Sequence, residues 1–104
     1  IIDQRVLRLT PTFFSYTLTK SALWTATRTM AQALAPHIRV NAVAPGPVLP
    51  NIYQTEADFA REWDSTLLRH GARPEEIADA VVFILRARSM TGQMITLDGG
   101  EHLQ

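Results

Sequence analysis

The run IRVNAVA at residues 38–44, followed by Pro45-Gly46-Pro47, constrains the fold more than any other stretch of this chain. The run is short, branched and largely apolar, which is typical of a strand that is buried on both of its faces. Two prolines directly after it prevent the strand from continuing, because proline lacks the N–H that a sheet ladder requires. We therefore expect an inner strand of a parallel sheet, covered by helices on both sides.

Helical patterns flank this strand on both sides along the chain. Before it, apolar residues recur at steps of three and four until Pro36 interrupts the pattern. After it, a proline followed by two glutamates marks the start of another helix, since proline is tolerated in a first turn and acidic side chains favour the positive end of the helix dipole. The expected helices cover residues 14–34, 56–68 and 74–87, and the expected loops cover residues 10–15 and 49–55.

Two further strands are expected at the ends of the chain. Ile1-Ile2-Asp3 has the composition of the end of a buried strand, and residues 94–97 predict another, which stops before a glycine pair. The resulting order of strand, helix, strand, helix, helix and strand predicts an α/β fold with a parallel sheet. So few strands would leave long edges unpaired. We therefore expect residues 1–104 to be the C-terminal portion of one doubly wound, Rossmann-type domain, with the N-terminal dinucleotide-binding half absent from this chain.

Composition narrows the functions that the chain could have. Ten acidic and ten basic side chains give a formal net charge of zero, so we expect neither nucleic acid nor a membrane as a partner. No apolar run approaches the roughly 20 residues of a membrane helix. The absence of cysteine excludes disulfides and thiolate ligands, and His37, His70 and His102 lack the spacing of metal ligands, so no metal is expected. These features suit a cytoplasmic protein.

The segment YTLTK at residues 16–20 contains the only lysine of the chain. Tyr16 and Lys20 are four residues apart on a predicted helix, so they share one face. A tyrosine with an ordinary pKa of about 10 is a poor proton donor at neutral pH. A nearby ammonium would lower that pKa. Taken alone, the pattern is more often just an exposed tyrosine beside an exposed lysine.

Three other stretches accompany this pair, namely HIRVNAVAPGPV, RPEEIADAVVFIL and TGQMITLDGG. In this order, with YTLTKSAL, they resemble the C-terminal half of the short-chain dehydrogenase/reductase family. The resemblance implies an oxidoreductase in which Tyr16 is the general acid and Lys20 binds the nicotinamide ribose and lowers the pKa of Tyr16. The residues that it places against the cofactor are Tyr16, Lys20, Pro45, Gly46, Pro47 and Val48.

The resemblance also bears on the cofactor and the assembly. Many relatives have a threonine where this chain has Pro50, so only backbone contacts to the nicotinamide are expected from this loop. NADP(H) is the expected cofactor. NAD(H) stays the alternative, because the residues that distinguish the two lie outside these 104 residues. The Gly-rich turn for the phosphates is also absent, so the chain alone should bind no dinucleotide. Relatives are commonly homotetramers, and we expect the same here.

Asp3 stands thirteen residues before Tyr16, where members of the family usually carry a serine. A carboxylate only accepts hydrogen bonds, and it would repel the negative charge that develops on a carbonyl oxygen. It suits a small substrate whose nitrogen must be protonated, as in reduction of a C=N bond. IID, YTLTKSALW and LAPHIRVNAVAPG resemble the pteridine reductase branch of the family, with its dihydropterin and dihydrofolate reductases, which implies a proton relay between Asp3 and Tyr16.

Other functions remain open at this point. Asp3 could be a drifted position in an ordinary carbonyl reductase, or a carboxyl group kept protonated by burial. The chain could also come from a dinucleotide-binding relative without catalysis, although such a protein need not keep Tyr16, Lys20 and an acid together. Enoyl-reducing relatives space their tyrosine and lysine more widely, which argues against that chemistry.

Overall fold

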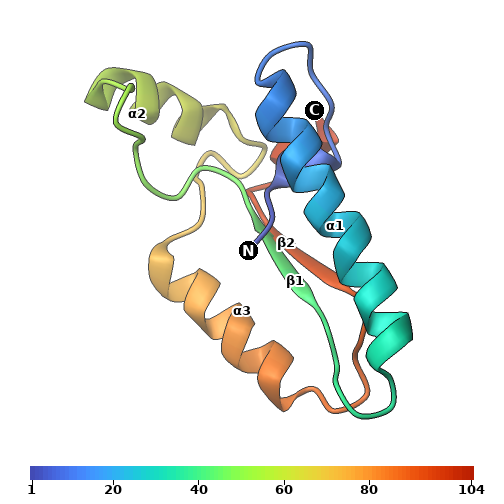
Figure 1. Cartoon of the computed structure of the whole chain (residues 1–104). Coiled ribbons are helices and arrows are strands. Elements are labelled where there is room, and N and C mark those ends of the chain that lie inside the picture. Colours follow the sequence, from blue (N-terminus) through green and yellow to red (C-terminus); the bar gives the residue numbers. More distant parts are fainter.

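The computed structural model describes all 104 residues and has an α/β architecture (Figure 1). In chain order the elements are η1 (Gln4–Val6), α1 (Phe14–Leu34), β1 (Ala42–Pro45), α2 (Glu56–Ser65), α3 (Pro74–Arg86), β2 (Met94–Leu97) and η2 (Glu101–Leu103), where η denotes a short 3-10 helix. None of the helices combines the length and the apolar character that crossing a membrane requires.

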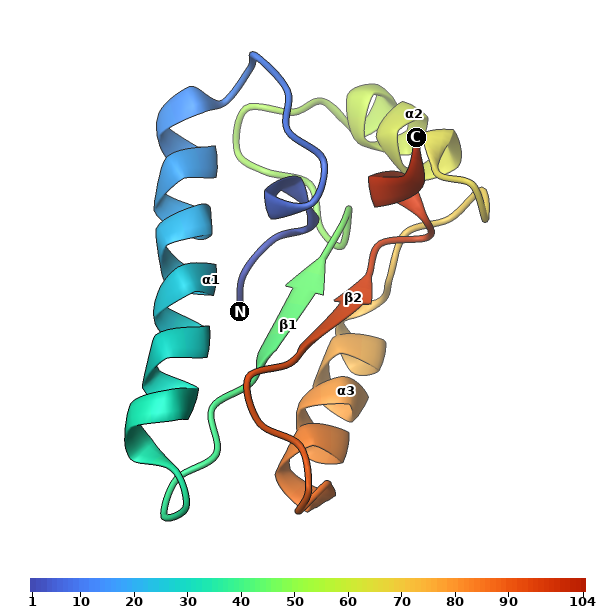
Figure 2. The same ribbon diagram turned by 90° about the vertical axis from the view of Figure 1, so that its right-hand side faces the viewer.

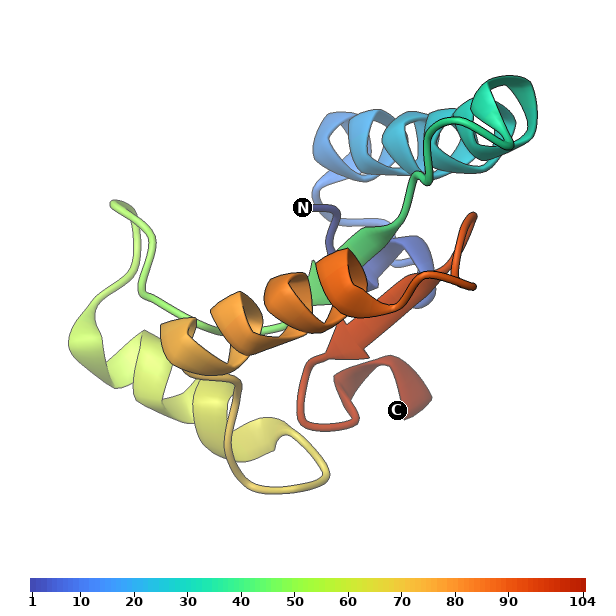
Figure 3. The ribbon, with the colours of Figure 1, turned by 90° about the horizontal axis from the view of Figure 1, so that it is seen from below.

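The two strands pair in parallel, as the sequence predicts. Their register joins Ala42 to Met94 and Pro45 to Leu97. Helix α1 lies on one side of β1 and α3 on the other, which Figures 2 and 3 show from two directions. This arrangement covers both faces of β1, where Ala42, Val43 and Ala44 are buried. The prediction of a strand buried on both faces is therefore confirmed.

The predicted strand at residues 38–44 begins later than expected, because the side chains before it hold the end of α3. The Arg39 guanidinium donates to four carbonyl oxygens between Ile84 and Met90 at 2.9–3.0 Å. The Asn41 amide donates to the Met90 carbonyl at 2.9 Å and accepts from the Gln93 N–H at 3.0 Å. Only from Ala42 onward does the backbone pair with β2.

The prediction that Ile1-Ile2-Asp3 ends a strand is wrong. The Ile2 N–H does donate to the Val43 carbonyl at 2.8 Å, so this segment lies beside β1. One hydrogen bond makes no ladder, and the next turn already leaves the sheet. The Asp3 carboxylate accepts from the Arg5 N–H and starts η1.

Two helix ends also differ from the prediction. Helix α2 ends at Ser65 rather than residue 68, because the buried Thr66 hydroxyl accepts from the His70 N–H at 3.1 Å and donates to the His70 carbonyl at 2.9 Å. These bonds form a compact turn in place of further helix. Helix α3 ends one residue early, at Arg86.

The carboxyl ends of both strands point to one end of the molecule. Figures 1 and 2 place η1, η2, α2 and the start of α1 at this same end. In open α/β sheets, ligands bind beyond the carboxyl ends of the strands. The fold therefore brings the N-terminal segment, the start of α1 and the loop after β1 to the end where a site is expected.

Candidate active site

Asp3 and Tyr16 form a hydrogen-bonded pair at this end of the molecule. The Tyr16 hydroxyl donates to Asp3 Oδ2 at 2.8 Å. The other carboxylate oxygen, Oδ1, accepts from the Arg5 N–H at 2.8 Å. Each oxygen of Asp3 thus has its own donor, which fixes the orientation of the carboxylate. The structure therefore brings together the two residues that the sequence predicted to act jointly.

The pKa of Tyr16 is raised to about 12, mainly because the hydroxyl is partly withdrawn from water. The hydrogen bond to Asp3 and the negative charge of Asp3 raise it further, while the positive charge of Arg5 acts in the opposite direction. The prediction that Lys20 lowers this pKa is wrong for this structure. The Lys20 ammonium lies over the ring face, 5.6 Å from the ring centroid, and the acid is closer to the hydroxyl. Tyr16 is therefore a neutral hydroxyl at pH 7.

Lys20 keeps most of its hydrogen-bonding capacity free. Its ammonium makes one long bond, 3.4 Å, to the Ile1 carbonyl. The side chain is half-buried on the same face of α1 as Tyr16. An ammonium has three donors, so Lys20 can hold hydroxyl groups of a ligand beside Tyr16.

The loop after β1 is held tightly between two other segments. The Gly46 N–H donates to the Leu97 carbonyl at 3.0 Å. A Cβ on Gly46 would lie 2.7 Å from Asp98 Cβ and 2.8 Å from Asp98 Cα. On the other side, a Cβ on Gly71 would lie 2.1 Å from the Pro47 carbonyl oxygen. The path of this loop therefore requires glycine at both positions.

Val48 ends this loop with backbone groups that are available to a ligand. Its N–H donates no hydrogen bond within the chain. Pro45 and Pro47 have no N–H, so Val48 is the first residue after Gly46 that can donate to a carboxamide. The loop lies at the carboxyl end of β1, where a nicotinamide would be held in a fold of this kind. The residues present thus fit the cofactor that the sequence predicted.

Two supporting positions differ in how well the sequence indicated them. The turn after β2, which the glycine pair indicated, is held by Asp98, whose carboxylate accepts from the N–H groups of Gly100 and His102. Gly99 and Gly100 have positive φ angles in this turn, 63° and 83°. Gly71 lies between the two predicted helices, and nothing in the neighbouring sequence indicates that Pro47 packs on it.

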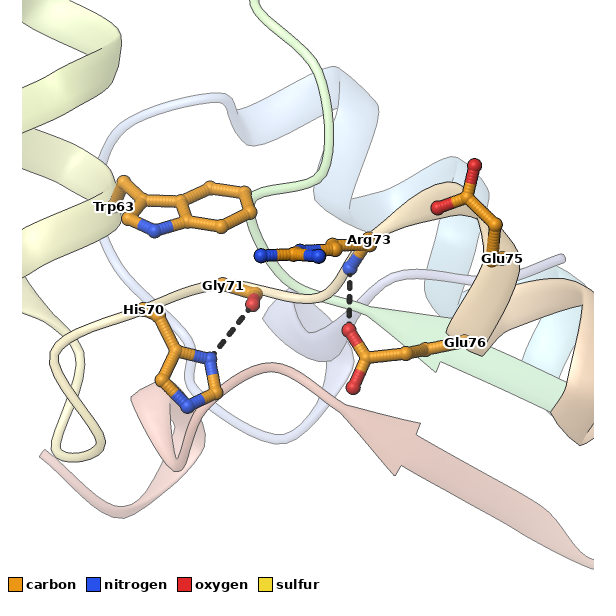
Figure 4. A pocket seen from close by; sticks show the side chains of 6 residues that line it. All are labelled: Trp63, His70, Gly71, Arg73, Glu75 and Glu76. Atoms are coloured by element: carbon orange, nitrogen blue, oxygen red, sulfur yellow. Dashed lines mark hydrogen bonds between the residues drawn. The ribbon is translucent and has the colours of Figure 1, made fainter.

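A broad hollow between α2 and α3 involves neither Tyr16 nor Lys20 (Figure 4). The residues that line it are Trp63, His70, Gly71, Arg73, Glu75 and Glu76. Their polar groups serve the backbone: Glu76 accepts from the Arg73 N–H at 2.7 Å, and the His70 ring bonds the Gly71 carbonyl at 3.0 Å. The chain contains no group of three or more His, Cys, Asp or Glu side chains that could hold a metal ion.

Comparison with known proteins identifies the family. The family described as "Enoyl-(Acyl carrier protein) reductase" matches residues 4–102. The "Short-chain dehydrogenase/reductase homolog YusR" of Bacillus subtilis is 37% identical over 89 residues, which are 85% of this chain and 69% of that protein. The chain belongs to the short-chain dehydrogenase/reductase family. The predicted fold class is confirmed as well, since the chain matches part of the Rossmann-type fold of its relatives.

Within this family, several relatives carry names that relate to pterins or folates. The crystal structure of "FolM Alternative dihydrofolate reductase 1" from Brucella suis in complex with NADP is 57% identical, with a TM-score of 0.96, over 99% of this chain and 42% of that one. A "Dihydromonapterin reductase" from Klebsiella pneumoniae is 33% identical over all 104 residues, which are 43% of that protein. The chain thus spans less than half the length of these two relatives.

Proposed function

We propose that this chain supplies the proton-donating part of an NADP(H)-dependent reductase that transfers hydride to a C=N bond of a pterin or dihydrofolate. The observation that carries the proposal is the 2.8 Å hydrogen bond from the Tyr16 hydroxyl to Asp3. A serine at that position could donate to a carbonyl oxygen, but an ionised Asp3 cannot. The similarity to the Brucella and Klebsiella reductases supports the same substrate class.

In this proposal Tyr16 and Asp3 deliver the proton. When bound, NADPH would supply the hydride for the carbon of the C=N bond, so that the nitrogen gains the electron pair. A tyrosine is protonated at neutral pH even with its ordinary pKa of about 10, and the raised pKa of about 12 keeps Tyr16 in that form. The nitrogen takes that proton, since a nitrogen with the added electron pair is a stronger base than a phenolate. Asp3 orients the hydroxyl, and after the transfer a proton taken up from solvent by the Asp3 carboxylate would pass to the Tyr16 phenolate.

Lys20 stands beside the proposed proton donor and faces the cofactor in this proposal. The Lys20 ammonium lies 5.6 Å from the Tyr16 ring centroid. In addition, Lys20 would hold the hydroxyls of the nicotinamide ribose, and the backbone of Pro45, Gly46, Pro47 and Val48 the carboxamide.

The proposal also includes the larger domain and the assembly to which this chain would belong. Residues 1–104 would be the C-terminal portion of a single Rossmann-type domain of a cytoplasmic homotetramer. Uncovered apolar side chains support this: Phe14 on α1 is 70% exposed and Leu85 on α3 is 68% exposed. Such faces require a cover in water. Other strands and helices of the domain, together with neighbouring subunits, would provide it.

A substrate comparison tests the proposed function. With the dinucleotide-binding half of the domain in place, NADPH consumption is measured with dihydrofolate, dihydromonapterin and a panel of simple ketones. We expect turnover of one or both C=N substrates and little of the ketones. Preference for the ketones would instead assign the protein to ordinary carbonyl reduction, where Asp3 has no role in the chemistry.

A further inference from the structure

Arg5 places an unpaired positive charge next to the proposed proton donors. Its backbone N–H donates to Asp3 Oδ1 at 2.8 Å, so it belongs to the same turn as the acid. Its guanidinium carbon lies 4.4 Å from the centroid of the Phe13 ring. Among the hydrogen bonds and ion pairs of the chain, none involves this guanidinium. Its five N–H donors are therefore unused by the protein.

The neighbouring charges do not neutralise Arg5. Arg8, three residues further on, pairs with the buried Glu101 at 3.4 Å. Arg5 influences Glu101 only through its charge, without contact. Asp3 is the nearest acid in sequence, and its oxygens accept from the Arg5 N–H and the Tyr16 hydroxyl but form no ion pair with the Arg5 guanidinium. The guanidinium thus remains available to an external anion.

The Phe13 ring gives this guanidinium a defined position. Phe13 is the N-cap of α1 and has a left-handed backbone conformation, with φ of 56°. It lies three residues before Tyr16, so the ring that carries Arg5 and the proton donor leave the same helix start. A guanidinium stacked on an aromatic face leaves its N–H edge open, and that edge matches a carboxylate in two parallel hydrogen bonds. Few side-chain rotamers then remain to be ordered on binding.

We propose that Arg5 is a specificity-determining residue that binds an anionic group on the tail of the substrate while the C=N bond lies at Asp3 and Tyr16. The inference rests on the proposed function and narrows its substrate class. It favours a planar heterocycle with a carboxylate-bearing tail, such as dihydrofolate, over one with a neutral side chain, such as dihydromonapterin.

Steady-state kinetics of Arg5→Gln and Arg5→Lys, with the dinucleotide-binding half in place, test this inference. For Arg5→Gln with dihydrofolate, we expect KM to rise roughly 10- to 100-fold, the range for a lost hydrogen bond to a charged group, with kcat within about twofold. With dihydromonapterin, both constants should stay within about twofold of the wild type. Arg5→Lys should retain part of the affinity for dihydrofolate, because lysine keeps the positive charge but lacks the planar guanidinium that makes two parallel hydrogen bonds to a carboxylate.

Arg28→Gln is the matched control, because Arg28 forms a second arginine–aromatic pair away from this end of α1. Its guanidinium carbon lies 5.0 Å from the Trp24 ring centroid. Arg28→Gln should change neither substrate's constants. Ionic strength adds an independent readout: KM for dihydrofolate should rise with salt in the wild type and be flat in Arg5→Gln.

Each other result has a distinct meaning. Equal losses with both substrates would show that Arg5 only supports the local fold and would overturn the inference. An unchanged KM for dihydrofolate would overturn it as well, as would the same selective loss in Arg28→Gln. Failure of the wild type to reduce either substrate would refute the proposed function itself, and with it the role of Arg5.

Discussion

Replacing Gly46 with alanine perturbs the loop that would hold the nicotinamide. The added Cβ would lie 2.7 Å from Asp98 Cβ and 2.8 Å from Asp98 Cα. Carbon atoms in good contact are about 3.5–4.0 Å apart, so the loop must move by roughly 0.7–1.3 Å. Asp98 cannot yield easily, because it is buried and its carboxylate holds the turn after β2.

This overlap should affect both the folding free energy and the rate of the reaction. Overpacking of this size costs about 1–3 kcal/mol of folding free energy. A displacement of about 1 Å at the loop also moves Val48 relative to Lys20, and misplacement on that scale costs about 100-fold in rate. We therefore expect Gly46→Ala to lower kcat/KM for NADPH far more than its loss of stability would explain.

The assay compares this variant with Gly92→Ala in denaturant unfolding and in NADPH-dependent turnover. Gly92 has φ of 69°, but a Cβ there would meet only Ala31 Cβ at 3.5 Å, an ordinary contact. Gly92→Ala should cost about 1 kcal/mol for its left-handed backbone and leave kcat/KM unchanged. Wild-type stability and wild-type KM for NADPH in Gly46→Ala would refute the close approach of the loop to Asp98.

Three further predictions concern acidity, a buried turn and the isolated chain. Asp3→Asn should lower the pKa of Tyr16 from about 12 toward its ordinary value. The pKa is measured from tyrosinate absorbance in a Tyr53→Phe background, which removes the signal of the other tyrosine of this chain. An unchanged pKa would exclude Asp3 as a cause of the shift. Because the folded-state pKa is raised, the stability that Tyr16 contributes is complete below pH of about 10 and is lost as the pH rises through about 12. Thr66→Val should cost about 1–3 kcal/mol in denaturant unfolding, since it removes both hydrogen bonds between the buried Thr66 hydroxyl and the backbone of His70, and a loss below about 0.5 kcal/mol would contradict this reasoning. The 104-residue chain by itself should aggregate or unfold, and a cooperative thermal transition in calorimetry would show that its exposed apolar faces need no cover.

Local patterns in the sequence predicted most of the fold correctly. The bounds of α1 and β2 agree with the structure, because helical periodicity and a short branched run before a glycine pair are local signals. The late start of β1 was not predictable from its own residues. Arg39 and Asn41 leave the strand to bind carbonyls about 50 residues further along the chain, and that contact exists only in the folded molecule.

For the candidate site, too, some features could be predicted from the sequence and others could not. The resemblance to the family implied that Asp3 and Tyr16 act together, and it also indicated the loop at Gly46. The direction of the Tyr16 pKa shift was mispredicted, because spacing to Lys20 says nothing about burial or about which charge is closer to the hydroxyl. Arg5 gave no signal of its own, because its importance depends on an aromatic ring that another part of the chain supplies.

The most direct test of the central claim is the substrate preference of Asp3→Ser in the protein with its dinucleotide-binding half. The account predicts that serine abolishes reduction of dihydrofolate and dihydromonapterin, by a factor of about 100–10,000 for loss of a proton-transfer group, while reduction of simple ketones stays weak or improves. If Asp3→Ser retains wild-type turnover of the C=N substrates, the Asp3–Tyr16 pair is not the proton donor, and the account is contradicted.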